Sequence, residues 1–216
     1  LGVRRITREA SGELAFDGNG PLVDTVLEMT RFSQEAILDR VAARGDLTAG
    51  LQDQLAASIA DYHAAAPVRL PTSGRGVMAG VVALNHTALD ACGAFSTPDI
   101  LALEAATRRQ LDRHAAVLDA RARDGKVRRC HGDLHLRNIC LIGGEPRLYD
   151  CLDFSEDLAT IDVLYDLAFL LMDLWRFGFH REANIIANRY CDLTGECEGY
   201  ALLGFFMAVR ATVRAH

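Results

Sequence analysis

The sequence lacks the features of several common protein classes. Its six cysteines form no Cys-x-x-Cys pair and are few for 216 residues, so neither a zinc cage nor a disulfide scaffold is expected. The longest apolar stretch, LYDLAFLLMDLW, contains two aspartates and is far shorter than the roughly 20 residues of a membrane span. The first residues lack the apolar core of a signal peptide. We therefore expect a cytoplasmic protein with reduced thiols and no membrane partner.

Positive charge is also scarce. The net charge is -6, and because binding to a phosphate backbone needs a basic surface, a nucleic-acid partner is not expected. The segment 121–147 is an exception, with seven arginines and lysines against three acidic residues. A solvated surface explains such a segment more often than a bound anion does, and both interpretations stay open.

The order of turn signals and hydrophobic periods predicts an α+β protein. Two short β-prone runs lie in residues 1–32, and Ser33 and Thr48 are placed to begin the helices that follow them. The glycine-rich segment 73–80 does not fit the pattern of a nucleotide-binding loop and is predicted to be an ordinary loop. A helix is expected over 97–125, a β-hairpin with its flanking strand over 126–151, and helices from 158 onward.

The segment CHGDLHLRNICLIGGEPRLYD combines residues suited to phosphoryl transfer. Asp133 and Asn138 are five residues apart, and Asp150 ends the second strand of the predicted hairpin. Carboxylate and amide oxygens without sulfur suit a hard cation such as Mg²⁺, and a carboxylate can take the proton of an acceptor hydroxyl. The same five-residue step separates the aspartate and asparagine of the protein-kinase catalytic loop. Asp133 is the candidate base.

With the later segment DVLYDLAFLLMDL, these residues resemble the aminoglycoside-phosphotransferase family of kinase-like enzymes, in particular a bacterial branch often fused to a P-loop ATPase-type domain. The resemblance implies a protein-kinase-like fold, with a two-strand remnant of the N-terminal lobe at 1–32 and a mainly helical catalytic C-terminal lobe, including the catalytic β-hairpin, at 33–216. It also implies ATP or GTP and Mg²⁺ as cofactors and, as the acceptor, an aminoglycoside-like molecule, an amino sugar or another small alcohol.

The same resemblance assigns roles to single residues. Asp133 becomes the catalytic base, and Asn138 and Asp150 become the magnesium ligands. His131 and Asp166 support the catalytic loop without reacting. Met29 and Thr30 fall on the hinge that contacts the nucleotide. The sequence pattern independently predicts that Asp166 is buried in an apolar helix and accepts hydrogen bonds from backbone N–H groups of the 131–135 loop.

Other elements of such a kinase are missing. The only lysine, Lys126, lies just before the catalytic loop, and there is neither a Gly-rich nucleotide loop nor a P-loop motif. We expect the remainder of the N-terminal lobe, and a P-loop domain, to belong to a longer protein. One alternative is a truncated kinase-like module that binds without catalysing. A more remote alternative is a metal-dependent hydrolase that uses His131, Asp133 and His135.

Overall fold

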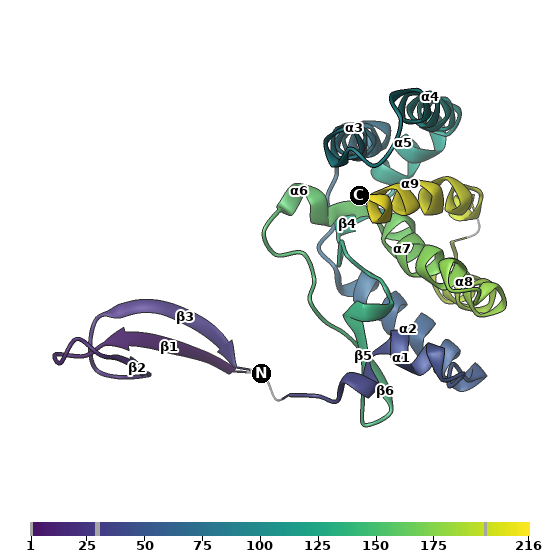
Figure 1. Cartoon of the computed structure of the whole chain (residues 1–216). Coiled ribbons are helices and arrows are strands. Elements are labelled where there is room, and N and C mark those ends of the chain that lie inside the picture. Colours follow the sequence, from purple (N-terminus) through teal and green to yellow (C-terminus); the bar gives the residue numbers. More distant parts are fainter. Residues whose placement is uncertain (1, 29–30, 197) are drawn as a thin grey trace. The chain divides into compact units, whose positions relative to one another are not determined.

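The computed structural model describes residues 2–28, 31–196 and 198–216 and divides into two compact units, Leu1–Gln34 and Glu35–His216 (Figure 1). Met29 and Thr30, the predicted hinge residues, lie outside the described residues. The chain combines helices with small antiparallel sheets, which agrees with the predicted α+β class. That the units correspond to two lobes of an enzyme, divided after residue 32, stays a prediction.

The first unit is an antiparallel sheet with the strand order β2-β1-β3. Its strands are β1 (Gly2–Arg8), β2 (Leu14–Phe16) and β3 (Leu22–Glu28). The first and last were predicted, and the prediction of only two strands is wrong. At three residues between two turns, β2 is too short to show a period-two pattern, yet it pairs with β1 through partners such as Ile6 and Phe16.

The second unit contains nine helices among its described residues, two two-stranded sheets and three short 3₁₀ turns. The α-helices are α1 (Leu38–Ala43), α2 (Ala49–Ala65), α3 (Gly74–Cys92), α4 (Thr97–Arg113), α5 (Ala115–Arg123), α6 (Glu156–Ala159), α7 (Val163–Arg176), α8 (His180–Thr194) and α9 (Leu203–Ala215). The strands are β4 (Val127–Arg129), β5 (Ile139–Ile142), β6 (Glu145–Leu148) and β7 (Thr160–Asp162). The 3₁₀ turns are η1 (Gln34–Ala36), η2 (Leu136–Asn138) and η3 (Glu198–Leu202).

Side-chain caps explain where several helices begin. Thr48 caps α2 by accepting a hydrogen bond from the N–H of Leu51, as predicted. The helix predicted from Ser33 begins instead at Leu38, after the turn η1. The loop predicted at 73–80 is wrong, because Ser73 caps α3 and the glycines lie in its first turns. Packing explains the glycine at position 74, since a Cβ there would clash with the carbonyl oxygen of Leu118 on α5.

One strand and one helix also differ from the prediction. The hairpin β5–β6 forms with Ile139 opposite Leu148, as predicted. The preceding strand β4 pairs with β7, a three-residue strand that directly precedes α7 in a segment predicted to be helical. The predicted single helix over 97–125 is divided at His114 into α4 and α5.

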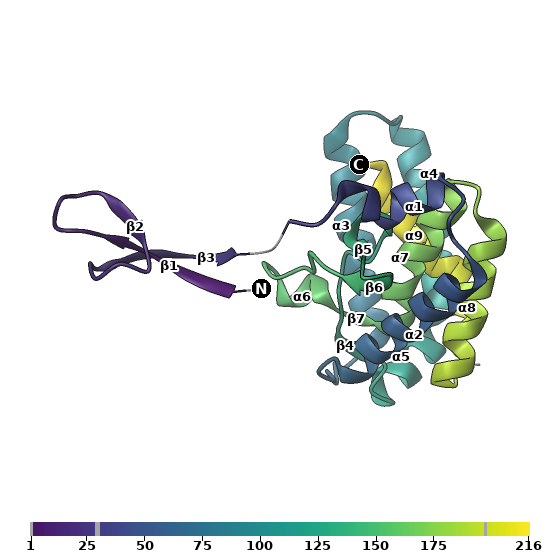
Figure 2. The ribbon, with the colours of Figure 1, turned by 90° about the horizontal axis from the view of Figure 1, so that it is seen from below.

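Helix α7 is the centre of the second unit and is buried over most of its length. It packs against α8 and α9, while α2 lies beside α8 (Figures 1 and 2). Helices α3, α4 and α5 pack against one another at one end. The segment between β4 and β5 hydrogen-bonds to Asp166 near the start of α7 and to Asp173 near its end, and its residues Leu134 and Leu136 are fully buried. None of the described helices is both long and apolar enough to cross a membrane.

Candidate active site

The candidate site is built on the loop 130–138, which joins β4 to β5. Backbone hydrogen bonds fix the loop: the N–H of Leu152 donates to the carbonyl of His131 at 2.9 Å, and the N–H of Tyr149 donates to the carbonyl of Asn138 at 3.0 Å. The second of these bonds extends the β5–β6 ladder by one pair. It therefore places Asp150 one residue beyond the partner of Asn138.

Asp166 anchors this loop to α7. Its side chain is fully buried, and its two oxygens accept hydrogen bonds from the N–H groups of His131, at 3.1 Å, and Gly132, at 2.9 Å. The predicted burial of Asp166 and its backbone donors are thus confirmed. His63 on α2 adds a third contact, with Nε2 at 3.1 Å from Oδ2.

Neighbouring groups stabilise the ionised form of Asp166. Burial acts to raise the pKa of this carboxyl, but the hydrogen bond from His63 and the charges of His63 and Arg210 outweigh burial and leave the pKa below its ordinary value. The opposite nitrogen of His63 lies 2.8 Å from the hydroxyl of Tyr190 on α8. A chain of contacts therefore ties the loop 130–138 to α2, α7 and α8.

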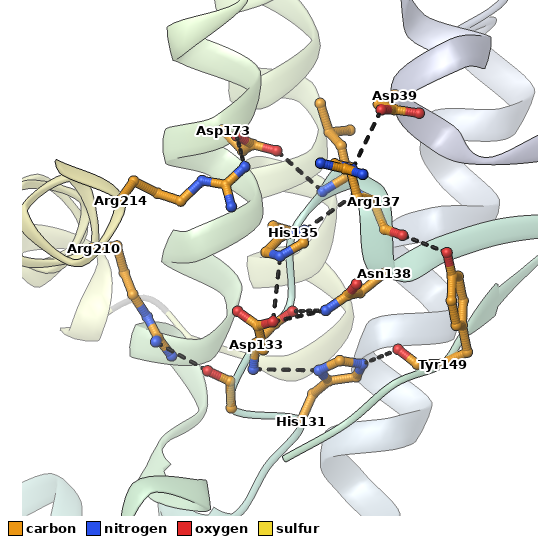
Figure 3. A network of polar contacts seen from close by, with 12 residues as sticks. Asp39, His131, Asp133, His135, Arg137, Asn138, Tyr149, Asp173, Arg210 and Arg214 are labelled. Carbon is orange, nitrogen blue, oxygen red and sulfur yellow. Dashed lines mark hydrogen bonds and ion pairs between the residues drawn. The ribbon is translucent and has the colours of Figure 1, made fainter. Parts of the chain in front are cut away.

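The carboxylate of Asp133 is oriented through one of its oxygens. Oδ2 accepts a hydrogen bond from Nδ2 of Asn138 at 2.9 Å and lies 3.3 Å from Nε2 of His135 (Figure 3). No described residue donates to Oδ1, and the side chain is 38% exposed. Burial acts to raise the pKa of Asp133, but the contacts with His135 and Asn138 prevail and lower it. Asp133 is therefore an ionised carboxylate at neutral pH, with one oxygen left for a ligand.

Both histidines of the motif position backbone and side chains. His131 lies with Nε2 at 2.8 Å from the carbonyl of Tyr149, while Nδ1 accepts the N–H of Asp133 at 3.3 Å. In His135, Nδ1 accepts the N–H of Arg137 at 3.2 Å, which leaves the proton on Nε2, facing Asp133. Between them, Gly132 adopts a φ of 82°, and a Cβ there would clash with the side chain of Leu152.

Asn138 and Asp150 supply oxygen atoms. Because Nδ2 of Asn138 donates to both the carbonyl and the carboxylate of Asp133, its amide oxygen points away from Asp133. Asp150 is exposed, has a φ of 59°, and makes no hydrogen bond or ion pair with the described residues. A donor set of one amide and one carboxylate oxygen fits Mg²⁺, which keeps much of its water shell in proteins.

The geometry gives no support to the hydrolase alternative. Both ring nitrogens of His131 contact the backbone, and those of His135 contact the N–H of Arg137 and Asp133. Within the described residues, the His, Cys and carboxylate groups close enough to share a metal are those of His63, Cys130 and Asp166. Burial raises the pKa of the Cys130 thiol well above its usual value, so a metal-binding thiolate is disfavoured there.

The only lysine is part of a buried ion network. Lys126 contacts Glu196 at 2.6 Å, and Arg121 contacts both Glu196, at 2.5 Å, and Asp162, at 2.7 Å. Asp162 also caps α7 by accepting the N–H of Leu164. Lys126 thus joins the start of β4 to the end of α8.

Sequence reasoning missed the contributions of α9. Arg210 is buried, donates to the carbonyls of Gly132 at 3.0 Å and Tyr165 at 3.2 Å, and lies over the Tyr165 ring at 3.9 Å. Further along α9, Arg214 lies 3.6 Å from the buried Asp173, whose other oxygen accepts the N–H of Leu136. An arginine near a chain end carries no local signal of such contacts, so no pattern identified them.

Comparison with known proteins agrees with this site. Residues 23–202 match the family described as the phosphotransferase enzyme family. The chain is 28% identical over 204 residues to uncharacterized proteins of Mycobacterium bovis and of Mycobacterium tuberculosis strains CDC 1551 and H37Rv. The aligned region covers 92% of this chain and 41% of each relative. No solved structure matches the chain.

Proposed function

Because the chain belongs to the phosphotransferase enzyme family, we propose that it contains the catalytic lobe of a small-molecule kinase. This kinase transfers the γ-phosphoryl group of ATP or GTP to a hydroxyl of a small alcohol. The observation that carries the proposal is the loop 131–138, in which Asn138 and His135 orient Asp133 through Oδ2 while Oδ1 has no donor among the described residues. That arrangement suits a group that receives the proton of an acceptor hydroxyl.

The proposed roles follow from the contacts. Asp133 is the base, and its oriented Oδ1 aligns the acceptor hydroxyl. His131 and Asp166 hold the loop through its backbone, so they position Asp133 without touching the acceptor. Proximity and orientation supply much of the rate acceleration in phosphoryl transfer, which makes this rigid support part of the mechanism.

Asn138 and Asp150 would hold Mg²⁺. When bound, the metal offsets the charge that develops on the transferred phosphoryl group. The contribution of the chain is to keep the two oxygens on adjoining backbone segments, because the Tyr149 N–H to Asn138 carbonyl bond ties those segments together. The amide of Asn138 has a second task, since its Nδ2 fixes Asp133. One residue thus links the metal site to the base.

The remaining parts of the kinase belong to the proposal as well. We place the end of the N-terminal lobe at 1–32, with Met29 and Thr30 contacting the nucleotide, and the helical catalytic lobe at 33–216. The chain spans 41% of the length of its curated relatives, which is compatible with further segments, the rest of the N-terminal lobe and a P-loop domain among them. A cytoplasmic location fits the use of ATP.

A non-catalytic binding module is the second candidate. The position of the only lysine favours it. Lys126 forms an ion pair with Glu196 at 2.6 Å in a buried network, so its ammonium group already has a partner. A kinase of this kind grips the nucleotide phosphates with a lysine. Under either candidate we expect the 216-residue chain alone to bind Mg-ATP weakly or undetectably and to be inactive, because the Gly-rich loop and the nucleotide-binding lysine are missing from it. The two candidates differ in the longer protein, which consumes nucleotide only if it is a kinase.

The test is Asp133→Asn in the full-length protein, assayed for nucleotide consumption with a panel of alcohols. An asparagine still offers one oxygen to Asn138 and His135, so the fold should be kept while the proton acceptor is lost. We expect turnover to fall by a factor of roughly 100 or more. Asp157→Asn, at an exposed position, is the matched control. Unchanged turnover in Asp133→Asn, with an unchanged melting temperature, would remove Asp133 from its role.

A further inference from the structure

A hollow of about 580 Å³ lies between α7 and α9. Its walls are mostly apolar, and the charged groups that line it are both arginines. The lining residues are Met172, Trp175, Arg176, Met207, Ala208, Ala211, Arg214 and Ala215. No carboxylate is among them, so the hollow combines an apolar surface with positive charge.

The positive charge of Arg176 and Arg214 exceeds the negative charge of the one buried carboxylate beside them, Asp173. Asp173 is fully buried, and its Oδ2 accepts the N–H of Leu136 at 3.2 Å. Its Oδ1 receives no hydrogen bond from the described residues and lies 3.6 Å from Arg214 and 3.9 Å from Arg176. Two guanidinium groups thus share one carboxylate, which leaves a surplus of one positive charge. Each guanidinium has five N–H donors, so donors remain for a ligand.

A short series of side-chain contacts links the hollow to the candidate active site. The guanidinium of Arg214 lies 6.0 Å from the ring centre of Phe169, and that ring lies 5.3 Å from the ring of His135. His135 in turn contacts Asp133 at 3.3 Å. Figure 3 shows Arg214 reaching from α9 toward Asp173, beside the loop that carries His135 and Asp133.

We propose that this hollow binds the acceptor, and that the acceptor is a small alcohol carrying a carboxylate and an apolar or flat body. This inference rests on the proposed kinase function. A carboxylate matches the single surplus charge, and the planar fork of an arginine pairs with it through two hydrogen bonds. Trp175 and the methionines contact the body of the acceptor. A polycationic aminoglycoside is disfavoured, because it would meet Arg176 and Arg214 without a carboxylate in the lining.

Trp175 makes the proposal measurable. It is the only tryptophan of the chain, lines the hollow and is 52% exposed, so its fluorescence reports binding there. The probes are 4-(hydroxymethyl)benzoate and its amide, which share one shape and differ in charge, together with kanamycin. We expect the benzoate to change the emission and to bind at least about tenfold more tightly than the amide, as for a hydrogen bond to a charged group. Equal affinities, tighter binding of kanamycin, or no response to the benzoate would each overturn the proposal.

Substitutions of the two arginines test whether the benzoate binds in the hollow. Arg214→Gln should weaken benzoate binding about tenfold and amide binding little, and Arg176→Gln, at a 56% exposed side chain, tests the same charge with less risk to folding. Arg181→Gln, on the exposed side of α8, is the matched control. If both hollow variants bind the benzoate like the control, the subsite is wrong.

The kinase proposal can fail separately. It fails if nucleotide consumption by the full-length protein does not depend on Asp133, whatever Trp175 reports. Conversely, Asp133-dependent phosphorylation of kanamycin, with no response of Trp175 to the benzoate, would keep the kinase and discard the carboxylate subsite.

Discussion

Arg210→Met tests whether α9 holds the catalytic loop in place. The guanidinium of Arg210 donates to the carbonyls of Gly132 and Tyr165 and lies 3.7 Å from Asp166. It is also stacked over the rings of Tyr165 and Phe169, at 3.9 and 4.6 Å. Methionine fills much of the same space, so the change removes the charge and its donors more than it removes packing.

The expected loss follows from these contacts. Removing one partner of a buried ion pair costs about 3–5 kcal/mol. The cost here lies at the lower end, because Asp166 keeps two backbone donors and His63. The carbonyl of Gly132 loses a charged donor, worth about 1.5–3 kcal/mol. Since these contributions overlap, we expect the free energy of unfolding to fall by about 3–4 kcal/mol, a large part of the roughly 5–15 kcal/mol that is typical of a domain.

Urea denaturation followed by circular dichroism measures this loss, with Arg181→Met as the control at an exposed site. Arg210→Lys should fall between the two, because lysine keeps the charge but lacks the planar fork that serves two carbonyls and stacks on the rings. The reasoning is refuted if Arg210→Met loses less than about 1 kcal/mol, the size of an ordinary single substitution. An Arg210→Lys variant as stable as the wild type would refute the role of the guanidinium shape.

Three further changes probe other buried groups. Asp166→Asn should lower the free energy of unfolding at pH 7 by about 3 kcal/mol. The folded-state pKa of Asp166 is lowered, so its contribution to stability is present above the unfolded pKa of about 3.9 and is lost as pH falls through the folded pKa. In urea titrations, the difference in the free energy of unfolding between variant and wild type should therefore shrink below about pH 4. Gly74→Ala should cost about 1–3 kcal/mol by thermal melting, because its Cβ would clash with Leu118, whereas Gly80→Ala, which meets open space, should not destabilise. Glu196→Gln should cost about 2–4 kcal/mol in the same assay, since Arg121 would lose one of its two buried carboxylate partners; a loss below about 1 kcal/mol would mean that the ion network contributes little.

Features with a local signal in the sequence were predictable. Thr48 precedes an apolar stripe, and it caps α2. The hairpin β5–β6 follows from two β-prone runs around a Gly-Gly turn, and with it the neighbourhood of Asn138 and Asp150. Asp166 was predictable for a different reason: a carboxylate surrounded by apolar residues on all sides of a helix must be buried, and a buried carboxylate needs donors.

Features without such a signal were missed. The strands β2 and β7 have three residues each, and neither can show a period. The break at His114 contains neither glycine nor proline, so the helical pattern continues across it. The glycines of α3 have the composition of a loop, but Ser73 caps the helix and Gly74 allows α3 to approach α5 closely. In each case tertiary packing decides against the local preference.

The contacts of α9 show why the charge of the site could not be inferred from its motif. The motif HGDLHLRN lies in the basic segment 121–147, but nothing in that segment indicates that arginines of α9 lie beside the loop. Folding brings Arg210 to Gly132 across 78 residues and Arg214 to Asp173 across 41. A loop shared by kinases with different acceptors can specify the transfer step, whereas the charge of the acceptor is set by side chains that only the fold brings near. Under the proposed acceptor subsite, the substrate class is encoded in α7 and α9 more than in the loop 131–138.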